Sequence, residues 1–269
     1  MTNNTAKTTH TQGFTLIELS IVLVIIGLIA GGILVGQDMI KGAEIRSTVK
    51  QVEQINAAMN TFRDKYRFLP GDITSTAAAQ FGFAARTGAV GRGDGNSYIE
   101  GGAAAATALN SETVLVWRDL NLVGLLDGSF TVGADAAAAP ANPDAVKTFL
   151  PEAKLGRGNV ITVYSATGNN FYQIGGIESA SATPGLPVLR PSMTPQEAFN
   201  LDQKLDDGRP TTGSSRAMDS LAASALNLPA ALGAAGTTGV CVVTGTLVYN
   251  TSTEASANTP ACALRVRTN

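Results

Sequence analysis

Few side chains in this sequence could take part in catalysis. The chain contains one histidine, His10, and two cysteines, Cys241 and Cys262. The chain therefore lacks the residues needed for zinc sites of histidine and cysteine, for Ser-His-Asp triads and for Cys-His nucleophile pairs. A carboxylate pair could still hydrolyse a glycosidic bond, but the sequence cannot show whether two acids lie about 5–10 Å apart. We predict a protein that is not an enzyme, with a membrane-tethered hydrolase of this carboxylate-pair type as the alternative.

Metal binding by acidic residues is the next chemistry to consider. Asp202, Asp206 and Asp207 gather around the end of an expected helix, and a turn at residues 94–96 contains two potential oxygen ligands. Calcium prefers such ligands, although neither group has the spacing of an EF-hand loop. Ordinary helix-end and turn hydrogen bonds explain both groups as well. Calcium bound by Asp202, Asp206 and Asp207 is thus one hypothesis, and no other cofactor is indicated.

The charge balance gives no support for nucleic-acid binding. Lysine and arginine number 19, aspartate and glutamate number 21, and the formal net charge is −2. Binding driven by the release of counterions from phosphates needs a basic excess that this chain lacks. We therefore expect no nucleic-acid partner.

The elements that position these residues begin with an apolar segment near the N-terminus. Residues 14–35 are apolar except for three polar residues and three glycines. A helix rising about 1.5 Å per residue covers roughly 33 Å over this length, close to the ~30 Å hydrocarbon core of a bilayer. Residues 1–13 are polar and contain a lysine and a histidine but no acid. This bias favours a cytoplasmic leader, a transmembrane helix over residues 14–35 and the rest of the chain across the membrane.

Glu18 is the unusual residue of the apolar segment. An acid at the bilayer centre costs roughly 2.5–3.5 kcal/mol on insertion scales, so it needs a partner. Cleavage after Gly13 would create an ammonium group on Phe14, with an ordinary pKa of about 7.7–8.0, one helical turn from Glu18. We expect Glu18 to pair with this terminus in its own chain or in a neighbouring subunit. The alternative is an ordinary signal peptide cleaved after Ala30, although its apolar region would usually run only about 7–15 residues.

Residues 12–19, with the sequence Gln-Gly-Phe-Thr-Leu-Ile-Glu-Leu, resemble the prepilin peptidase recognition site of type IV pilins and type II secretion pseudopilins. The resemblance implies that the peptidase cuts after Gly13 and that the new amine of Phe14 is methylated. It also implies that Glu18 guides the docking of subunits. The motif is short but specific, because the cut precedes the apolar run instead of following it.

The resemblance implies a structural subunit of a type IV pilus-like filament that polymerises through its N-terminal helix. Its partners would be prepilin peptidase, copies of itself and other pilin-like subunits, an inner-membrane assembly platform with its ATPase, and lipid before assembly. The chain would lie first in the bacterial inner membrane, then in a pilus on the cell surface or in a periplasmic pseudopilus. The alternatives are a minor subunit that initiates the filament or acts as an adhesin at its tip, and a subunit of a type II secretion pseudopilus.

Helical periodicity continues beyond the apolar segment. Apolar residues recur there at spacings of three and four, with polar residues between them, and this pattern predicts an amphipathic helix. The stripe consists of Ile45, Val49, Val52, Ile55, Met59, Phe62 and Tyr66. Proline at position 70 disfavours helix in the residue before it. We therefore predict a stalk helix over residues 14–68; it contains no proline, although type IV pilins often have one in this helix.

Residues 69–269 are expected to form a globular extracytoplasmic head. A helix over residues 111–120 should bury Trp117, and a capping box with proline at the first helical position opens a helix over residues 194–205. Alternating patterns predict strands, which lie at residues 159–164, 170–174, 240–249 and 263–266. The predicted fold class is α+β: a long N-terminal helix packed against a small antiparallel sheet, with extra helices and long loops.

Cys241 and Cys262 lie beyond the membrane segment, in a compartment that favours oxidation. A disulfide closing the loop 241–262 would stabilise the head by roughly 3 kcal/mol. Two free thiols are the alternative. The resemblance points to the disulfide, because pilins commonly have a C-terminal loop closed in this way.

Overall fold

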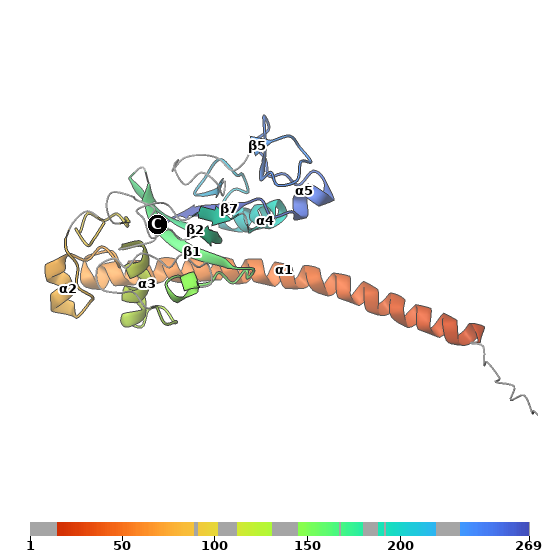
Figure 1. Ribbon diagram of the computed structural model, residues 1–269, viewed down its shortest axis with the longest axis horizontal. Helices are drawn as coiled ribbons and strands as arrows, with labels where there is room; N and C mark the ends of the chain where they lie inside the picture. The colour runs from red at the N-terminus through yellow and green to blue at the C-terminus, as the bar shows by residue number, and fades with distance from the viewer. Residues whose placement is uncertain are drawn as a thin grey trace, which may run out of the picture. The chain divides into compact units, whose positions relative to one another are not determined.

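The computed structural model describes residues 15–88, 91–101, 112–130, 145–166, 168–179, 188–190, 192–218 and 232–268 (Figure 1). The chain divides into two units, Met1–Ala43 and Glu44–Asn269. The first contains the apolar part of helix α1 (Leu16–Tyr66), and the second contains the rest of α1 with the remaining elements. The predicted boundaries of leader, stalk and head, at residues 13 and 68, remain predictions.

The amphipathic part of α1 packs as its pattern predicts. Ile45, Val52, Ile55, Met59 and Phe62 are buried, and the other two members of the stripe pack against the same core. The helix ends at Tyr66, because Arg67 takes a left-handed backbone conformation with φ of 67° and Pro70 follows. The predicted helix was therefore two residues too long at this end.

An antiparallel sheet lies in the second unit. Its strands are ordered β1 (Asn159–Ala166), β2 (Asn169–Ser179), β7 (Ala263–Arg267) and β4 (Ser215–Met218), and β3 (Val188–Arg190) also pairs with β2. In the central register, Ile161 of β1 faces Ile174 of β2, which in turn faces Leu264 of β7. These side chains share one hydrophobic core with the buried stripe of α1. The α+β fold class is thus confirmed.

The head contains five further helices within the described residues. They are α2 (Ser75–Phe81), α3 (Glu112–Leu122), α4 (Pro195–Leu205), α5 (Glu254–Asn258) and a short 3-10 helix η1 (Ala145–Thr148), and α2, α3 and α4 contribute buried side chains to this core. Trp117 of α3 is fully buried, as predicted. The predicted capping box of α4 is also confirmed, since Thr194 and Glu197 exchange hydrogen bonds between side chain and backbone. Ser111, the expected cap of α3, lies outside the described residues.

The strand predicted over residues 240–249 is wrong. Only Val242–Val243 form a strand there, β6, which pairs with β5 (Leu232–Gly233) in a separate two-stranded sheet. A turn follows, in which Val243 accepts a hydrogen bond from the N–H of Leu247 and donates one to the carbonyl of Val248. Gly245 and Leu247 both have positive φ, which an extended strand does not allow. The apolar residues on both sides of the turn gave the pattern of one continuous strand, so the turn was not predicted.

Candidate functional site

The first turn of α1 holds Glu18 in a capping box. Thr15 donates two hydrogen bonds to Glu18 Oε2, from its backbone N–H at 2.7 Å and from its hydroxyl at 2.8 Å. The backbone N–H of Glu18 returns a bond to the Thr15 hydroxyl at 3.3 Å. A threonine followed three residues later by glutamate is the sequence signature of this arrangement, and it was not among the features predicted above. Glu18 therefore has a structural role within its own helix, whatever it binds in an assembly.

The rest of this first unit offers an almost continuous apolar surface. In the part of the chain that the structure describes, one helix, α1, is long and apolar enough to cross a membrane, and its most apolar window is 0% buried. Its large hydrophobic side chains between Leu16 and Ile40 have exposed fractions from 49% to 89%. Apolar surface of this extent needs lipid or another protein to cover it. The predicted processing residues Gly13 and Phe14 lie outside the described residues.

Cys241 and Cys262 form a disulfide in the head, with their Cα atoms 5.2 Å apart. Both are fully buried. Cys262 is also fixed from the other side, because its backbone exchanges hydrogen bonds with that of Met193 at 3.0 and 3.1 Å. The bond thus ties the segment of β6 to the start of β7 and hence to the main sheet.

Replacing both cysteines by alanine should lower the free energy of unfolding of the head by about 3 kcal/mol, since the unfolded chain regains the freedom of a 21-residue loop. Urea unfolding followed by the fluorescence of Trp117, the only tryptophan, measures this difference. Reductant should destabilise the wild-type protein and leave the C241A/C262A variant unchanged. If reductant changes the stability of both proteins equally, the disulfide does not stabilise the head.

The structure brings the three predicted calcium ligands together. Carboxylate oxygens of Asp202, Asp206 and Asp207 lie within 4.8 Å of one another. Asp202 is buried and accepts a hydrogen bond from the Tyr249 hydroxyl at 2.9 Å. Burial raises the pKa of Asp202 to about 6. Oxygen atoms of the kind that calcium prefers are thus available at one point.

The two exposed aspartates of this group also have ordinary structural roles. Asp206 Oδ2 accepts hydrogen bonds from the backbone N–H groups of Ser214 and Ser215. Asp207 accepts bonds from the Thr212 hydroxyl and the Arg209 N–H, and these bonds lower its pKa. The turn after α4 is therefore held by these carboxylates without a metal ion. Calcium binding by the three aspartates remains a prediction.

A second acidic group occupies the other end of the head. Carboxylate oxygens of Asp72, Asp94 and Glu112 also lie within 4.8 Å of one another. The turn that contains Asp94 was predicted as a candidate ligand site, but Asp72 and Glu112, which are almost fully buried, were not. No local signal identifies them, because residues 72, 94 and 112 meet only through the tertiary fold. We name Asp72, Asp94 and Glu112 the acidic cluster.

The buried members of the acidic cluster clamp the glycine-rich loop 91–101. Asp72 accepts hydrogen bonds from the backbone N–H groups of Gly95 and Ser97, both at 2.7 Å. Glu112 accepts bonds from Gly93 at 2.6 Å and from Glu100 at 2.9 Å. These four bonds favour the ionised carboxylates, but burial has the larger effect and raises the pKa of Asp72 to about 7 and that of Glu112 to about 8. The cluster is therefore poised to bind protons near neutral pH.

Glycine is required at the centre of this loop. Gly93 has a φ of 77°, and a Cβ atom there would collide with the carbonyl oxygen of Ile73 and the side chain of Arg86. This close approach lets its N–H reach the carboxylate of Glu112. Glycine at position 93 is thus needed for the hydrogen bond between the loop and Glu112.

A buried ion pair supports the same end of the head. Arg86 and Asp119 are paired, and each side chain is only 1% exposed. Both also hold Gly71, whose N–H donates to Asp119 Oδ2 at 2.6 Å and whose carbonyl accepts from Arg86 Nε at 3.3 Å. Burial raises the pKa of Asp119, and Arg86 opposes that shift. The pair fixes the turn that follows α1.

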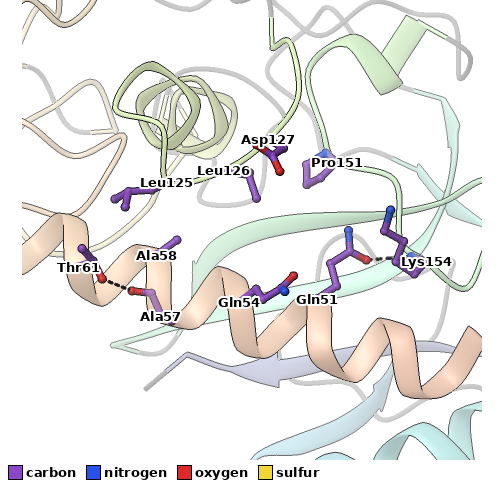
Figure 2. A pocket seen from close by; sticks show the side chains of 10 residues that line it. All are labelled: Gln51, Gln54, Ala57, Ala58, Thr61, Leu125, Leu126, Asp127, Pro151 and Lys154. Atoms are coloured by element: carbon purple, nitrogen blue, oxygen red, sulfur yellow. Dashed lines mark hydrogen bonds between the residues drawn. The ribbon is translucent and has the colours of Figure 1, made fainter.

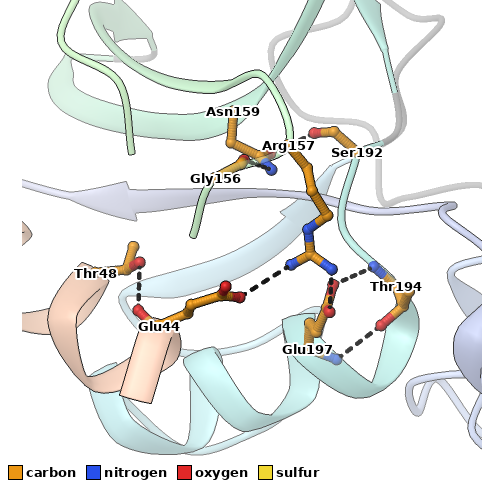
Figure 3. A network of polar contacts seen from close by, with 8 residues as sticks. All are labelled: Glu44, Thr48, Gly156, Arg157, Asn159, Ser192, Thr194 and Glu197. Carbon is orange, nitrogen blue, oxygen red and sulfur yellow. Dashed lines mark hydrogen bonds and ion pairs between the residues drawn. The ribbon is translucent and has the colours of Figure 1, made fainter. Parts of the chain in front are cut away.

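Arg157, in the turn before β1, bridges α1 and α4, as Figure 3 shows. Its Nη1 lies 2.5 Å from Glu197 Oε1 on α4, and its Nη2 lies 3.9 Å from Glu44 Oε2 on α1. Glu197 is the residue that also completes the capping box of α4. Glu44, at the start of the second unit, is thereby linked through Arg157 to α4.

A groove of about 570 Å³ runs beside α1 in the head. Figure 2 shows Gln51, whose amide oxygen accepts a hydrogen bond from the backbone N–H of Lys154 at 2.8 Å. The amide nitrogen of Gln51 donates to the carbonyl of Glu152, also at 2.8 Å. The charged residues that line the groove are Asp127 and Lys154, together with amide and small apolar side chains. This lining provides no carboxylate pair and no nucleophile activated by a base.

Comparison with known proteins identifies one part of the chain. Residues 9–34 match the family model described as the prokaryotic N-terminal methylation motif. Searches among curated proteins and among solved structures give no match. The match includes the residues of the predicted cleavage site and the first turns of α1, where Thr15 and Glu18 form the capping box. The chain therefore carries, at residues 9–34, the N-terminal methylation signature of type IV pilins and pseudopilins.

Proposed function

We propose that this protein is a structural subunit of a type IV pilus-like filament. The observation that carries the proposal is the methylation motif at residues 9–34, which leads directly into the exposed apolar part of α1. Prepilin peptidase would remove residues 1–13, and the apolar helix would move from lipid into the core of the filament.

Glu18 is proposed to guide the docking of each new subunit. One of its oxygens accepts both bonds from Thr15, so the carboxylate is held at the start of the helix in a defined orientation. In a protein interior, an ion pair with the methylated amine of Phe14 from a neighbouring subunit would offset the desolvation of both charges. The capping box and the docking role are compatible, because a carboxylate can accept several hydrogen bonds.

The proposed partners and locations follow from this role. They are prepilin peptidase, other copies of the chain or related pilin-like subunits, and an inner-membrane assembly platform with its ATPase. The protein would start in the inner membrane and end in a surface pilus or a periplasmic pseudopilus. The large head over residues 69–269 favours, as a second candidate, a minor subunit that initiates the filament or acts as a tip adhesin.

The processing step predicts a defined mature N-terminus. Mass spectrometry of protein recovered from membranes or filaments should find Phe14 as the first residue, carrying one N-methyl group. Replacing Gly13 by alanine keeps a small residue and should slow the cut, whereas replacing Thr11 by alanine serves as a matched control. A mature chain that begins at Gly31 would instead establish an ordinary signal peptide.

The docking step predicts an assembly defect without a processing defect. Glu18→Ala should leave cleavage largely intact but reduce the yield of sheared filaments by about tenfold or more, as expected for the loss of about 1.4 kcal/mol at each junction. Ser20→Ala, on the same helix, is the control. Glu18→Gln keeps the bonds from Thr15 through its carbonyl oxygen but loses the charge. A normal filament yield from the glutamine variant would show that the capping box, and not the ion pair, is the role of this residue.

A further inference from the structure

A second cavity in the head has a different character from the groove beside α1. It measures about 220 Å³ and lies between the last turns of α1, the glycine-rich loop, the β1–β2 turn and the end of β7. Its two charged lining residues are Arg63 and Arg267, and no acidic residue lines it. Met59 and Leu69, both buried, supply apolar surface. The cavity therefore combines two positive charges with an apolar wall.

The two arginines differ from other cations of the head in that both line one cavity, whose lining contains no acidic residue. Arg86 and Arg157 are paired with carboxylates. Within the described residues, neither guanidinium of Arg63 and Arg267 makes a hydrogen bond or an ion pair. Both side chains are exposed and line the same small cavity, so their positive charges make this place attractive to an anion. An anionic ligand could pair with both guanidinium groups at once.

The wall of the cavity is held rigidly in place. Asn170 accepts a hydrogen bond from the N–H of Ile99 and donates one to the carbonyl of Ser97, each at 3.0 Å. Its own carbonyl accepts from the N–H of Thr268, next to Arg267, at 3.0 Å. The loop, the β1–β2 turn and the end of β7 are thus joined through one residue. A preorganised wall of this kind lowers the entropy lost when a ligand binds.

We propose that this cavity binds a small sugar that carries an oxyanion, either a carboxylate or a phosphate. Arginine is well suited to both groups, because its planar fork makes two parallel hydrogen bonds to them. Tyr98, which is 38% exposed, also lines the cavity, and an aromatic ring adds apolar surface for the sugar body. The volume is below the roughly 300–1,000 Å³ of sites for drug-sized ligands, which limits the ligand to about one sugar ring. The proposal does not depend on filament formation.

Titration calorimetry with the full-length protein in detergent micelles tests this site. The probes are glucuronate, glucose 6-phosphate, glucose and inorganic phosphate. Glucuronate, glucose 6-phosphate or both should bind, and the probe that binds identifies the oxyanion; glucose should not bind measurably. Failure of both acidic sugars to bind overturns the proposal. If inorganic phosphate binds as tightly as either acidic sugar, the sugar ring contributes nothing to binding, and that part of the proposal is wrong.

Variants assign the binding to the cavity. Arg63→Gln and Arg267→Gln should each weaken binding about tenfold, and the double variant should abolish it. Arg46→Gln is the matched control, because Arg46 is an exposed arginine on α1 that does not line the cavity. Thermal unfolding should be unchanged in all of them, since these side chains are exposed. An equal loss of affinity in the Arg46 variant would show that the anion is attracted by the general surface charge, and would overturn the site.

Discussion

Replacing Arg86 by methionine should lower the free energy of unfolding of the head by about 3–5 kcal/mol. The change leaves the carboxylate of Asp119 buried without its cation, and breaking a buried pair from one side has costs of this size. It also removes the hydrogen bonds that Arg86 donates to the carbonyls of Gly71 and Ala84. Urea unfolding followed by the fluorescence of Trp117 measures the difference directly.

Two further variants separate the charge from the shape of the side chain. Arg46→Met, at an exposed position of α1, should change stability by less than about 0.5 kcal/mol. In the double variant Arg86→Met with Asp119→Leu the unpaired charge is gone, so a large part of the loss should be recovered. Recovery should stay incomplete, because the N–H of Gly71 then lacks its acceptor. A double variant no more stable than R86M would show that the loss came from packing rather than from the buried charge.

Among the described residues, the sequence predicted the three longest helices, α1, α3 and α4, but not the short helices α2, α5 and η1. The spacing of Ile45, Val52 and Phe62 required one apolar face on α1, and the proline at position 70 marked where that helix stops. Thr194 and Glu197 predicted the start of α4, because they exchange hydrogen bonds locally in a capping box. These features depend on residues three or four positions apart, so the sequence displays them directly.

The features that the sequence did not reveal depend on contacts between distant residues. Asp72 and Glu112 meet only after the glycine-rich loop has folded back over them. Likewise, Val242 and Tyr249 read as one strand by alternation, but a turn lies between them and they face each other across an isolated bridge. The same holds for the cavity with Arg63 and Arg267, which combines the end of α1 with the last strand. Composition and periodicity do not predict contacts between residues that are distant in the sequence.

The acidic cluster gives the second large effect, a dependence of stability on pH. Burial raises the pKa of Asp72 to about 7 and that of Glu112 to about 8, whereas unfolded carboxyl groups titrate near about 4. Between these values the folded head binds more protons than the unfolded chain. Stability from these two groups is therefore fully present below about pH 4 and is lost as the pH rises toward and through about 7–8. Each group contributes a slope of up to about 1.4 kcal/mol per pH unit within this window.

Urea unfolding at a series of pH values between 5.5 and 8.5 tests this linkage. The wild-type head should become less stable as the pH rises, and the variant Asp72→Asn with Glu112→Gln should show a flatter slope. Only the slope is compared, because the substitutions also change the absolute stability. In the wild type both oxygens of each carboxylate accept from a backbone N–H, whereas an amide has only one oxygen that can accept. Asp127→Asn, at an exposed position, is the control and should keep the wild-type slope. If the double variant also keeps it, the protons are taken up elsewhere and the loop clamp is not the pH-sensitive element of the head.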